Sequence, residues 1–240
     1  MIKIIKILLL NFLIAYNVHA QENLSEEDIN EMIYQYIMDN PEVILKSVDN
    51  LRKKMEESSI ENNNFLKNEF NNFANDNKIP NFGDPNAKVI IVEFVDYNCG
   101  YCKKSLDAIN KLLNSNLSLK ISFRDYPILS SSSRLAAKAA LAAIKQNKYF
   151  ELHSNLLTTK GNLSEEKIFE IAENVGINIT KLKIDMEDPA IEILLIDNEN
   201  LAKKLNIRGT PTFIINGKLY AGALEFEKLK ALIDKALSEI

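Results

Sequence analysis

The chain carries its only two cysteines in the stretch Val89-Ile-Ile-Val-Glu-Phe-Val-Asp-Tyr-Asn-Cys99-Gly-Tyr-Cys102. An apolar, β-branched run leads into the pair, and a helix-forming run beginning Lys103-Lys104-Ser105-Leu106 follows it. Residues three apart on the first turn of a helix lie on one side, so the two thiols come within disulfide reach. The partial positive charge and free N–H groups of a helix N-terminus favour a thiolate on Cys99. The stretch therefore predicts a dithiol that cycles between reduced and oxidised forms.

A lone pair of cysteines has two other common roles. One role is a structural disulfide, but a disulfide that closes a loop of two residues removes little chain entropy and so stabilises the fold only weakly. A zinc site would need two more soft ligands, and His153 is the only histidine beyond the first twenty residues. His153 has no other histidine or cysteine near it in the sequence, which favours a packing or surface role. We therefore expect a redox-active pair, with no metal and no cofactor.

Residues Met1 to Ala20 have the pattern of a cleaved secretory signal peptide. Lys3 and Lys6 form a basic region, an apolar run follows, and the small Ala20 stands at the expected cleavage site. The alternative is an uncleaved membrane anchor, but the run is short for a bilayer and contains Asn11. Cleavage removes two lysines and no acidic residue, so the formal charge of −4 becomes more negative. An acidic chain gives no reason to expect nucleic-acid or anionic-lipid binding.

Residues 21–78 are predicted to form a helical arm. Ser25-Glu26-Glu27-Asp28 is a capping signal, and apolar residues then recur at the spacing of one helical face. Asn40-Pro41-Glu42 ends this helix and begins a second, longer one. The apolar stripe of the second helix is thin and alternates by fours and threes, as in a helix that pairs with another helix. We expect the arm to mediate self-association; the alternative is that both helices pack on the domain of their own chain.

Residues 79–240 have the pattern of an α/β domain. A cluster of breaker residues at Ile79–Asn86 marks its start. The pattern predicts a strand at Lys88–Val95, a helix after Cys102 and a second strand at Leu119–Arg124. A helical block at about 127–206 follows. The chain then forms a hairpin of Thr212–Ile215 with Leu219–Ala221 and ends in a helix at Glu225–Leu237. Strand–helix–strand implies a parallel crossover, and the Asn216-Gly217 hairpin adds antiparallel strands. We therefore predict a mixed sheet with helices on its faces and a helical insertion.

Glu93 is an acidic residue inside an otherwise apolar strand, six positions before Cys99. One explanation is an edge position that faces water. A buried carboxylate is unfavourable unless it is protonated or paired, and such groups tend to lie near chemistry. Glu93 is therefore a candidate to exchange protons with the buried thiol.

A Cys-x-x-Cys motif after the first strand of a βαβ unit is the thioredoxin signal. Together with Arg208-Gly209-Thr210-Pro211 before the hairpin and the helical insertion, it makes the chain resemble the DsbA family of thiol–disulfide oxidoreductases over roughly residues 79–240. The resemblance implies a thioredoxin-like fold, a Cys99–Cys102 disulfide, a cis peptide bond at Pro211 beside that disulfide, and a buried Glu93. The helical arm is similar to that of secreted DsbA-like proteins of the ScsC kind, which oligomerise through their N-terminus.

The resemblance also implies an activity. A periplasmic oxidase or isomerase of this kind forms or rearranges disulfide bonds in exported proteins. In such an enzyme Cys99 attacks or is attacked, Cys102 resolves the mixed disulfide, and Thr210-Pro211 borders the substrate groove. The expected partners are exported proteins with cysteines or disulfides, a membrane redox partner and other copies of the chain.

Two details depart from the strongly oxidising family members. Their inner dipeptide is Pro-His, whereas this chain has Gly100-Tyr101, so we place the pKa of Cys99 towards the upper part of the range of roughly 3.5 to 7.5. Gly-Tyr with Thr210 before the proline is similar to the active site of the dimeric disulfide isomerases. Oxidase and isomerase roles both stay open. A different class is a periplasmic copper(I)-binding protein or chaperone that uses the same dithiol, although no methionine or histidine cluster surrounds it.

Overall fold

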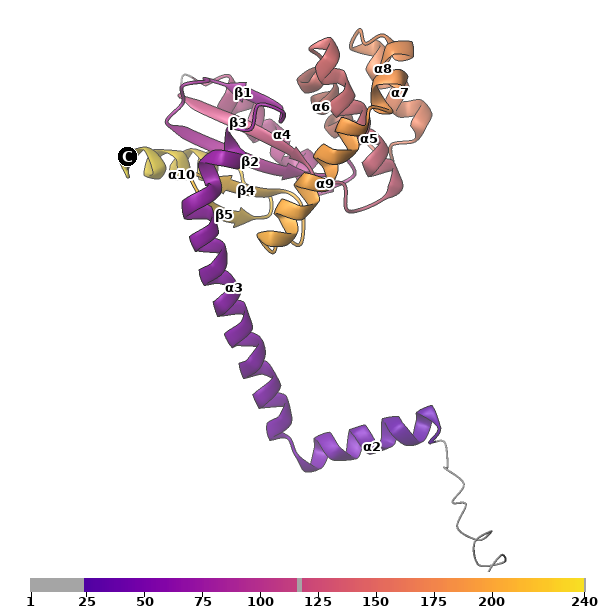
Figure 1. The fold of residues 1–240 in the computed structure, drawn as a ribbon, viewed down its shortest axis with the longest axis vertical. Coiled ribbons are helices and arrows are strands. Elements are labelled where there is room, and N and C mark those ends of the chain that lie inside the picture. The colour runs from indigo at the N-terminus through magenta and orange to yellow at the C-terminus, as the bar shows by residue number, and fades with distance from the viewer. Residues whose placement is uncertain (1–23, 116–117, 240) are drawn as a thin grey trace, which may run out of the picture. The chain divides into compact units, whose positions relative to one another are not determined.

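The computed structural model describes residues 24–115 and 118–239 (Figure 1). The predicted signal peptide, residues 1–20, lies outside the described residues. The chain divides into two compact units, Met1–Glu56 and Glu57–Ile240. In the described part, no helix is long and apolar enough to cross a membrane.

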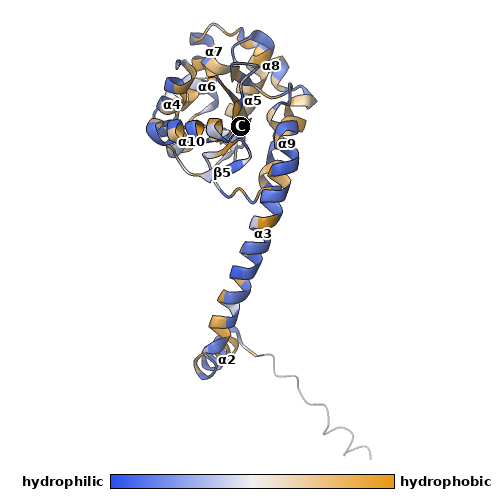
Figure 2. Ribbon diagram, turned by 90° about the vertical axis from the view of Figure 1, so that its left-hand side faces the viewer, coloured by the Kyte–Doolittle hydropathy of each residue, from blue (hydrophilic) through white to orange (hydrophobic). Residues whose placement is uncertain are grey.

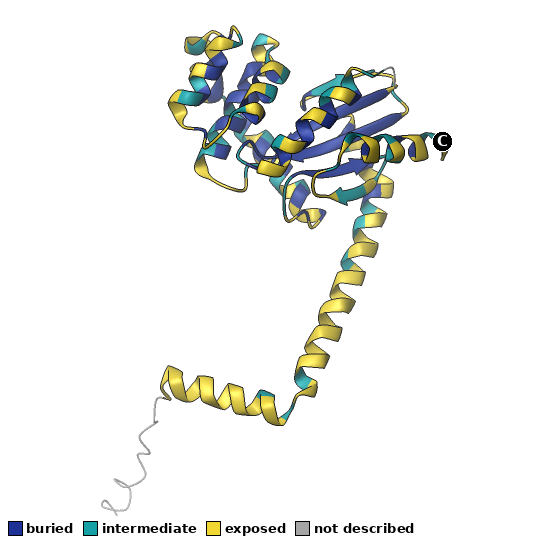
Figure 3. Cartoon of the chain, turned by 180° about the vertical axis from the view of Figure 1, so that it is seen from behind, coloured by how far each residue is buried: buried dark blue, intermediate teal, exposed yellow. Residues whose placement is uncertain are grey.

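The described part of the first unit consists of helix α2 (Glu26–Asp39) and the N-terminal part of helix α3 (Glu42–Ala74). Ser25 and Asp28 form a reciprocal capping box, in which each side chain accepts the other's backbone N–H at 3.1 Å. No residue of α2 is buried, although Figure 2 colours part of this helix as hydrophobic. Figure 3 shows the same helix as exposed. Within residues 24–56, the large exposed apolar residues are Leu24, Ile29, Met32, Ile33, Tyr34, Tyr36, Met38, Ile44, Leu45, Val48, Leu51 and Met55.

The second unit is built on a five-stranded sheet with the order β1-β3-β2-β4-β5. The strands are β1 (Asn81–Gly83), β2 (Val89–Val95), β3 (Leu119–Asp125), β4 (Thr212–Ile215) and β5 (Lys218–Ala221). Strands β2 and β3 are parallel, and the other pairs are antiparallel. The β4–β5 turn places both Asn216 and Gly217 at positive φ, as a tight hairpin turn requires. The predicted mixed sheet is confirmed; β1, inside the breaker cluster, was not predicted.

Each face of the sheet is covered by helices. One face packs against α4 (Gly100–Leu113), α10 (Phe226–Ser238) and the insertion. The other face packs against α9 (Pro189–Lys204) and the last turns of α3, where Leu66, Phe70 and Ala74 are buried. Burial of a large apolar side chain contributes roughly 1.5–3 kcal/mol. Residues 57–74 belong to the second unit, whereas the sequence pattern predicts an arm that extends to residue 78.

The helical insertion lies between β3 and β4. It comprises α5 (Ser131–Ala142), a short 3₁₀ helix η1 (Ala143–Gln146), α6 (Tyr149–Thr158), α7 (Glu165–Asn174), α8 (Ile179–Met186) and α9. Helices α5, α7, α8 and α9 each have an N-cap residue whose side chain accepts a backbone N–H of the first turn. In chain order these residues are Ser130, Ser164, Asn178 and Asp188. These helices lie within the block predicted at about 127–206.

Candidate active site

The two cysteines lie at the N-terminus of α4, as the sequence predicts. Cys99 is the N-cap residue in an extended conformation, with φ −75° and ψ 115°, and Cys102 lies in the first turn. Cys99 is 7% exposed, whereas Cys102 is fully buried. Both thiols are free, so the structure presents the dithiol form. Cys99 is thus the sulfur nearer to solvent.

The loop before β4 faces Cys99. The Thr210–Pro211 peptide bond is cis, which confirms the expectation from the family resemblance. The Cys99 thiol donates to the Thr210 carbonyl oxygen at 3.0 Å. The Thr210 hydroxyl is buried and forms no hydrogen bond within the described part of the chain. The Thr212 hydroxyl donates to the Gly209 carbonyl at 2.8 Å, and this hydrogen bond stabilises the same loop.

These surroundings favour a thiolate on Cys99. A hydrogen bond from the Cys102 thiol is the largest cause that lowers the pKa of Cys99, to about 5. Partial burial opposes this change in pKa, while the Thr210 side chain and the backbone N–H groups of Cys102 and Tyr101 add to it. This pKa is lower than the upper part of the family range, because the sequence does not show the contributions of Cys102 and Thr210.

Cys102 and Glu93 are perturbed in the opposite direction. Burial, the hydrogen bond to Cys99 and the charge of Glu93 all raise the pKa of Cys102. Glu93 is 2% exposed on the central strand β2. Burial and then the charge of Cys99 raise the pKa of Glu93 to about 8. A proton is therefore held at Cys102, and a second titrates at Glu93 near neutral pH.

Gly100 and Tyr101 separate the cysteines on the outer side of the helix start. Both are exposed, and Tyr101 is 62% exposed. The Lys104 ammonium lies 5.2 Å from the centroid of the Tyr101 ring. The dipeptide therefore presents an aromatic face to solvent beside Cys99.

Four buried polar side chains lie close to this site. The Tyr97 hydroxyl is 3.0 Å from His153 Nδ1, and the Tyr149 hydroxyl donates to Asp125 at 3.2 Å. Burial raises the pKa of Asp125 to about 7, although hydrogen bonds from both tyrosines oppose the rise. Burial lowers the pKa of His153 to about 3. Sequence reasoning predicted a packing or surface role for His153 but missed its polar partners, which come from distant parts of the chain.

Asp96 and Asn98, on either side of Tyr97, are also polar residues that sequence reasoning did not single out. Both bind the helical insertion through their side chains. Their place directly after a buried strand and before the cysteines is the signal that could have found them. No group of three or more histidine, cysteine, aspartate or glutamate residues able to hold a metal ion occurs among the described residues.

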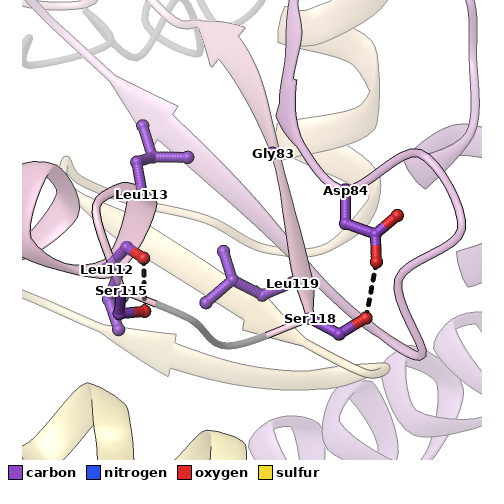
Figure 4. Close-up of a pocket in the computed structure, with 7 residues that line it drawn as sticks. All are labelled: Gly83, Asp84, Leu112, Leu113, Ser115, Ser118 and Leu119. Atoms are coloured by element: carbon purple, nitrogen blue, oxygen red, sulfur yellow. Dashed lines mark hydrogen bonds between the residues drawn. The ribbon is translucent and has the colours of Figure 1, made fainter.

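A pocket occurs at the C-terminal end of α4, whereas the cysteines lie at the N-terminal end of this helix. Figure 4 shows its lining, which includes Gly83 at the end of β1, Asp84 directly after it, and Leu112 and Leu113 at the end of α4. Ser118 donates to the Asp84 carboxylate at 2.7 Å across it. None of its lining residues is a predicted site residue, so we assign the chemistry to the Cys99 site.

Comparisons with known proteins agree with this geometry. Residues 74–235 match the family model described as Thioredoxin. The thiol-disulfide exchange protein alpha-DsbA2 from Wolbachia pipientis is 33% identical, with a TM-score of 0.68 over 75% of this chain and 97% of that one. Proteus mirabilis ScsC in a transitional conformation is 25% identical, with a TM-score of 0.68 over 92% of this chain and 99% of that one. The latter match extends into the N-terminal region.

Curated relatives include disulfide bond formation protein D from Bacillus subtilis. It is 27% identical over 172 residues, which cover 66% of this chain and 77% of that protein. The Na(+)/H(+) antiporter NhaA 1 from Salinispora arenicola is 27% identical over 158 residues, which cover 65% of this chain and 24% of that protein. The chain thus spans about a quarter of the length of the antiporter relatives it matches.

Proposed function

The chain belongs to the thioredoxin family and, within it, to the DsbA-type proteins, and we propose that it exchanges disulfides with exported proteins through Cys99 and Cys102. The observation that carries the proposal is the contact of the Cys99 thiol with the loop at cis Pro211, beside a buried second thiol. A lowered pKa makes Cys99 a thiolate at neutral pH, which is both the attacking form and a good leaving group.

In the oxidising direction, a substrate thiolate attacks Cys99 Sγ of the protein's disulfide. The Cys99–Cys102 bond breaks, and Cys102 leaves with the electron pair. A second substrate thiolate then attacks the substrate sulfur of the mixed disulfide and releases Cys99 as a thiolate. The substrate gains a disulfide and the protein gains the two electrons as its dithiol. In the other direction, Cys99 attacks a substrate disulfide and Cys102 resolves the intermediate.

Glu93 exchanges a proton with Cys102 in this scheme. The leaving Cys102 sulfur takes up a proton in its buried position, because burial raises its pKa. Glu93 is protonated below about pH 8, and its ionised form raises the pKa of Cys102, so the two groups interact and Glu93 can supply that proton. In the reverse step its carboxylate takes the proton from the Cys102 thiol.

The substrate is proposed to lie along Thr210-Pro211. The backbone of this loop precedes β4 and borders Cys99, so an extended peptide can form main-chain hydrogen bonds there. Tyr101, two residues after Cys99, offers an exposed aromatic surface. Neither main-chain hydrogen bonds nor contact with an aromatic ring requires a particular substrate sequence, as expected of an enzyme that accepts many exported proteins.

Self-association is proposed to occur through the first unit. Twelve large apolar side chains of residues 24–56 are exposed, and a helix buries its apolar face only against another element. A second copy of the chain offers the same apolar helices as a partner. The similarity to ScsC covers 92% of this chain and so includes part of the N-terminal helices, which supports a shared role for this region. An oligomer would bring several Cys99 sites into one particle.

We place the protein in the periplasm, exported by residues 1–20, and expect a membrane redox partner to restore its redox state. Refolding of ribonuclease tests the function. Recovery of scrambled, fully oxidised ribonuclease indicates an isomerase, whereas recovery of the reduced enzyme indicates an oxidase. Cys99→Ser is expected to abolish either activity. A wild-type protein that accelerates neither reaction would contradict the proposal.

A further inference from the structure

Three consecutive residues before Cys99 each bind the helical insertion. The first is Asp96, whose carboxylate accepts the backbone N–H groups of Ile128 at 2.9 Å and Leu129 at 3.0 Å. The same carboxylate accepts the Asn98 N–H at 2.8 Å. Asp96 therefore ties the start of the insertion to the loop that leads into the cysteines.

The second residue is Tyr97, which is fully buried. Its hydroxyl is 3.0 Å from Nδ1 of His153 on α6, and the two rings meet edge to face with centroids 5.5 Å apart. Tyr97 thus joins the loop to the second helix of the insertion.

The third residue, Asn98, makes the most extensive contact. Its amide nitrogen lies 3.1 Å from Ser130 Oγ and 3.0 Å from both Ser132 Oγ and Ser133 Oγ. Its amide oxygen accepts the backbone N–H of Leu163 at 3.4 Å. Asn98 therefore connects the N-terminus of α5 with the segment before α7, two parts of the insertion that the chain itself separates by α5 and α6.

The Asn98 side chain affects Cys99 by fixing the position of the loop and not by direct contact with the sulfur. In the described part of the chain, its hydrogen bonds all go to the insertion and none goes to the Cys99 sulfur. Asn98 is nevertheless the residue directly before Cys99, whose own N–H donates to the Asp96 carbonyl at 3.0 Å. The hydrogen bonds that stabilise the Cys99 thiolate weaken steeply with distance and angle, so a small shift of the loop changes them.

We propose that Asn98 is a positioning residue that fastens the helical insertion to the active-site loop and thereby holds Cys99 against Thr210. The inference rests on the proposed role of Cys99 as the exchanging thiol. In this arrangement the insertion sets the reactivity of Cys99, in addition to covering the sheet.

The test is the titration of the Cys99 thiolate by ultraviolet absorbance in the reduced full-length protein. Asn98→Ala is expected to raise the pKa of Cys99 by roughly one unit. Because the wild-type pKa is about 5, the thiolate fraction near pH 5 then falls from about one half to about one tenth. At pH 8 both proteins are thiolates and react with a thiol reagent at similar rates, which a merely unfolded variant would not do.

Two further variants complete the test. Ser132→Ala removes one acceptor of the Asn98 amide at a half-buried position and is expected to raise the pKa in the same direction by less. Asn155→Ala is the matched control, because the side-chain amide of Asn155 donates to the Glu151 carbonyl within α6, and it should leave the titration unchanged. If Asn98→Ala and Ser132→Ala both titrate like the wild type, the inference is wrong. Failure of the wild type in ribonuclease refolding contradicts the proposed function instead, whatever the titrations show.

Discussion

The thiol of Cys99 donates a hydrogen bond of 3.0 Å to the carbonyl oxygen of Thr210, which lies 111 positions further along the chain. The contact joins the start of α4 to the loop before β4. Thr210 therefore presents two groups to the sulfur: a carbonyl that accepts from the thiol and a hydroxyl that favours the thiolate.

The Thr210 hydroxyl gives the first prediction. Thr210→Val preserves the shape of the side chain and removes this hydroxyl, so the pKa of Cys99 is expected to rise by roughly half a unit to one unit. The measurement is the absorbance titration of the reduced protein. Thr158→Val, whose hydroxyl bonds Asn155 at the end of α6, is the control. A titration of Thr210→Val that overlays the wild type would show that the hydroxyl does not act on the thiolate.

The buried carboxyl of Glu93 predicts how stability depends on pH. Its pKa is about 8 in the folded reduced protein and 4.5 as an ordinary glutamate. The folded state thus keeps a proton that the unfolded state loses, and its advantage is full below pH 4.5 and declines as the pH rises to about 8. Glu93→Gln should remove a decline on the order of a few kcal/mol in the free energy of unfolding.

Urea denaturation of the reduced proteins at pH 4.5 and pH 8 measures this difference. The same change at the exposed Glu227 is the control. Equal pH dependence in the wild type and Glu93→Gln would mean that Glu93 ionises freely in the folded state.

The exposed apolar side chains of the first unit predict an oligomer. Ile29 and Ile33 lie one turn apart on α2 and are 43% and 52% exposed. Ile29→Asp combined with Ile33→Asp places two charges in the proposed contact and should convert the oligomer to a monomer in light scattering. The Cys99 titration should stay unchanged, because that site lies in the other unit. Glu31→Gln is the control, and a monomer mass for the wild type would refute the arm's role.

The parts of the fold that depend on local signals could be predicted from the sequence. The strand, Cys-x-x-Cys and helix succession, the Asn216-Gly217 hairpin and the Ser25 cap all follow from residues within a few positions of one another. The short strand β1 was missed because it is formed by pairing with β3 rather than by its own propensity.

The candidate site divides in the same way. The cysteines and the proline loop were predicted, partly through the family resemblance. The contacts of Tyr97 with His153 and of Asn98 with Ser130 join residues 56 and 32 positions apart. Which distant polar side chains meet depends on how α5 and α6 pack, and a single sequence does not specify this. The same reason explains why the pKa of Cys99 is lower than predicted.

Trapping of the mixed disulfide tests the central claim most directly. Cys102→Ser leaves the Cys99 thiolate able to attack a substrate disulfide but removes the sulfur that resolves the intermediate. Incubated with a disulfide-containing protein and analysed by mass spectrometry without reductant, this variant is predicted to accumulate a covalent adduct at Cys99, and Cys99→Ser is predicted to form none. Turnover by the wild type with no adduct on Cys102→Ser would contradict the account.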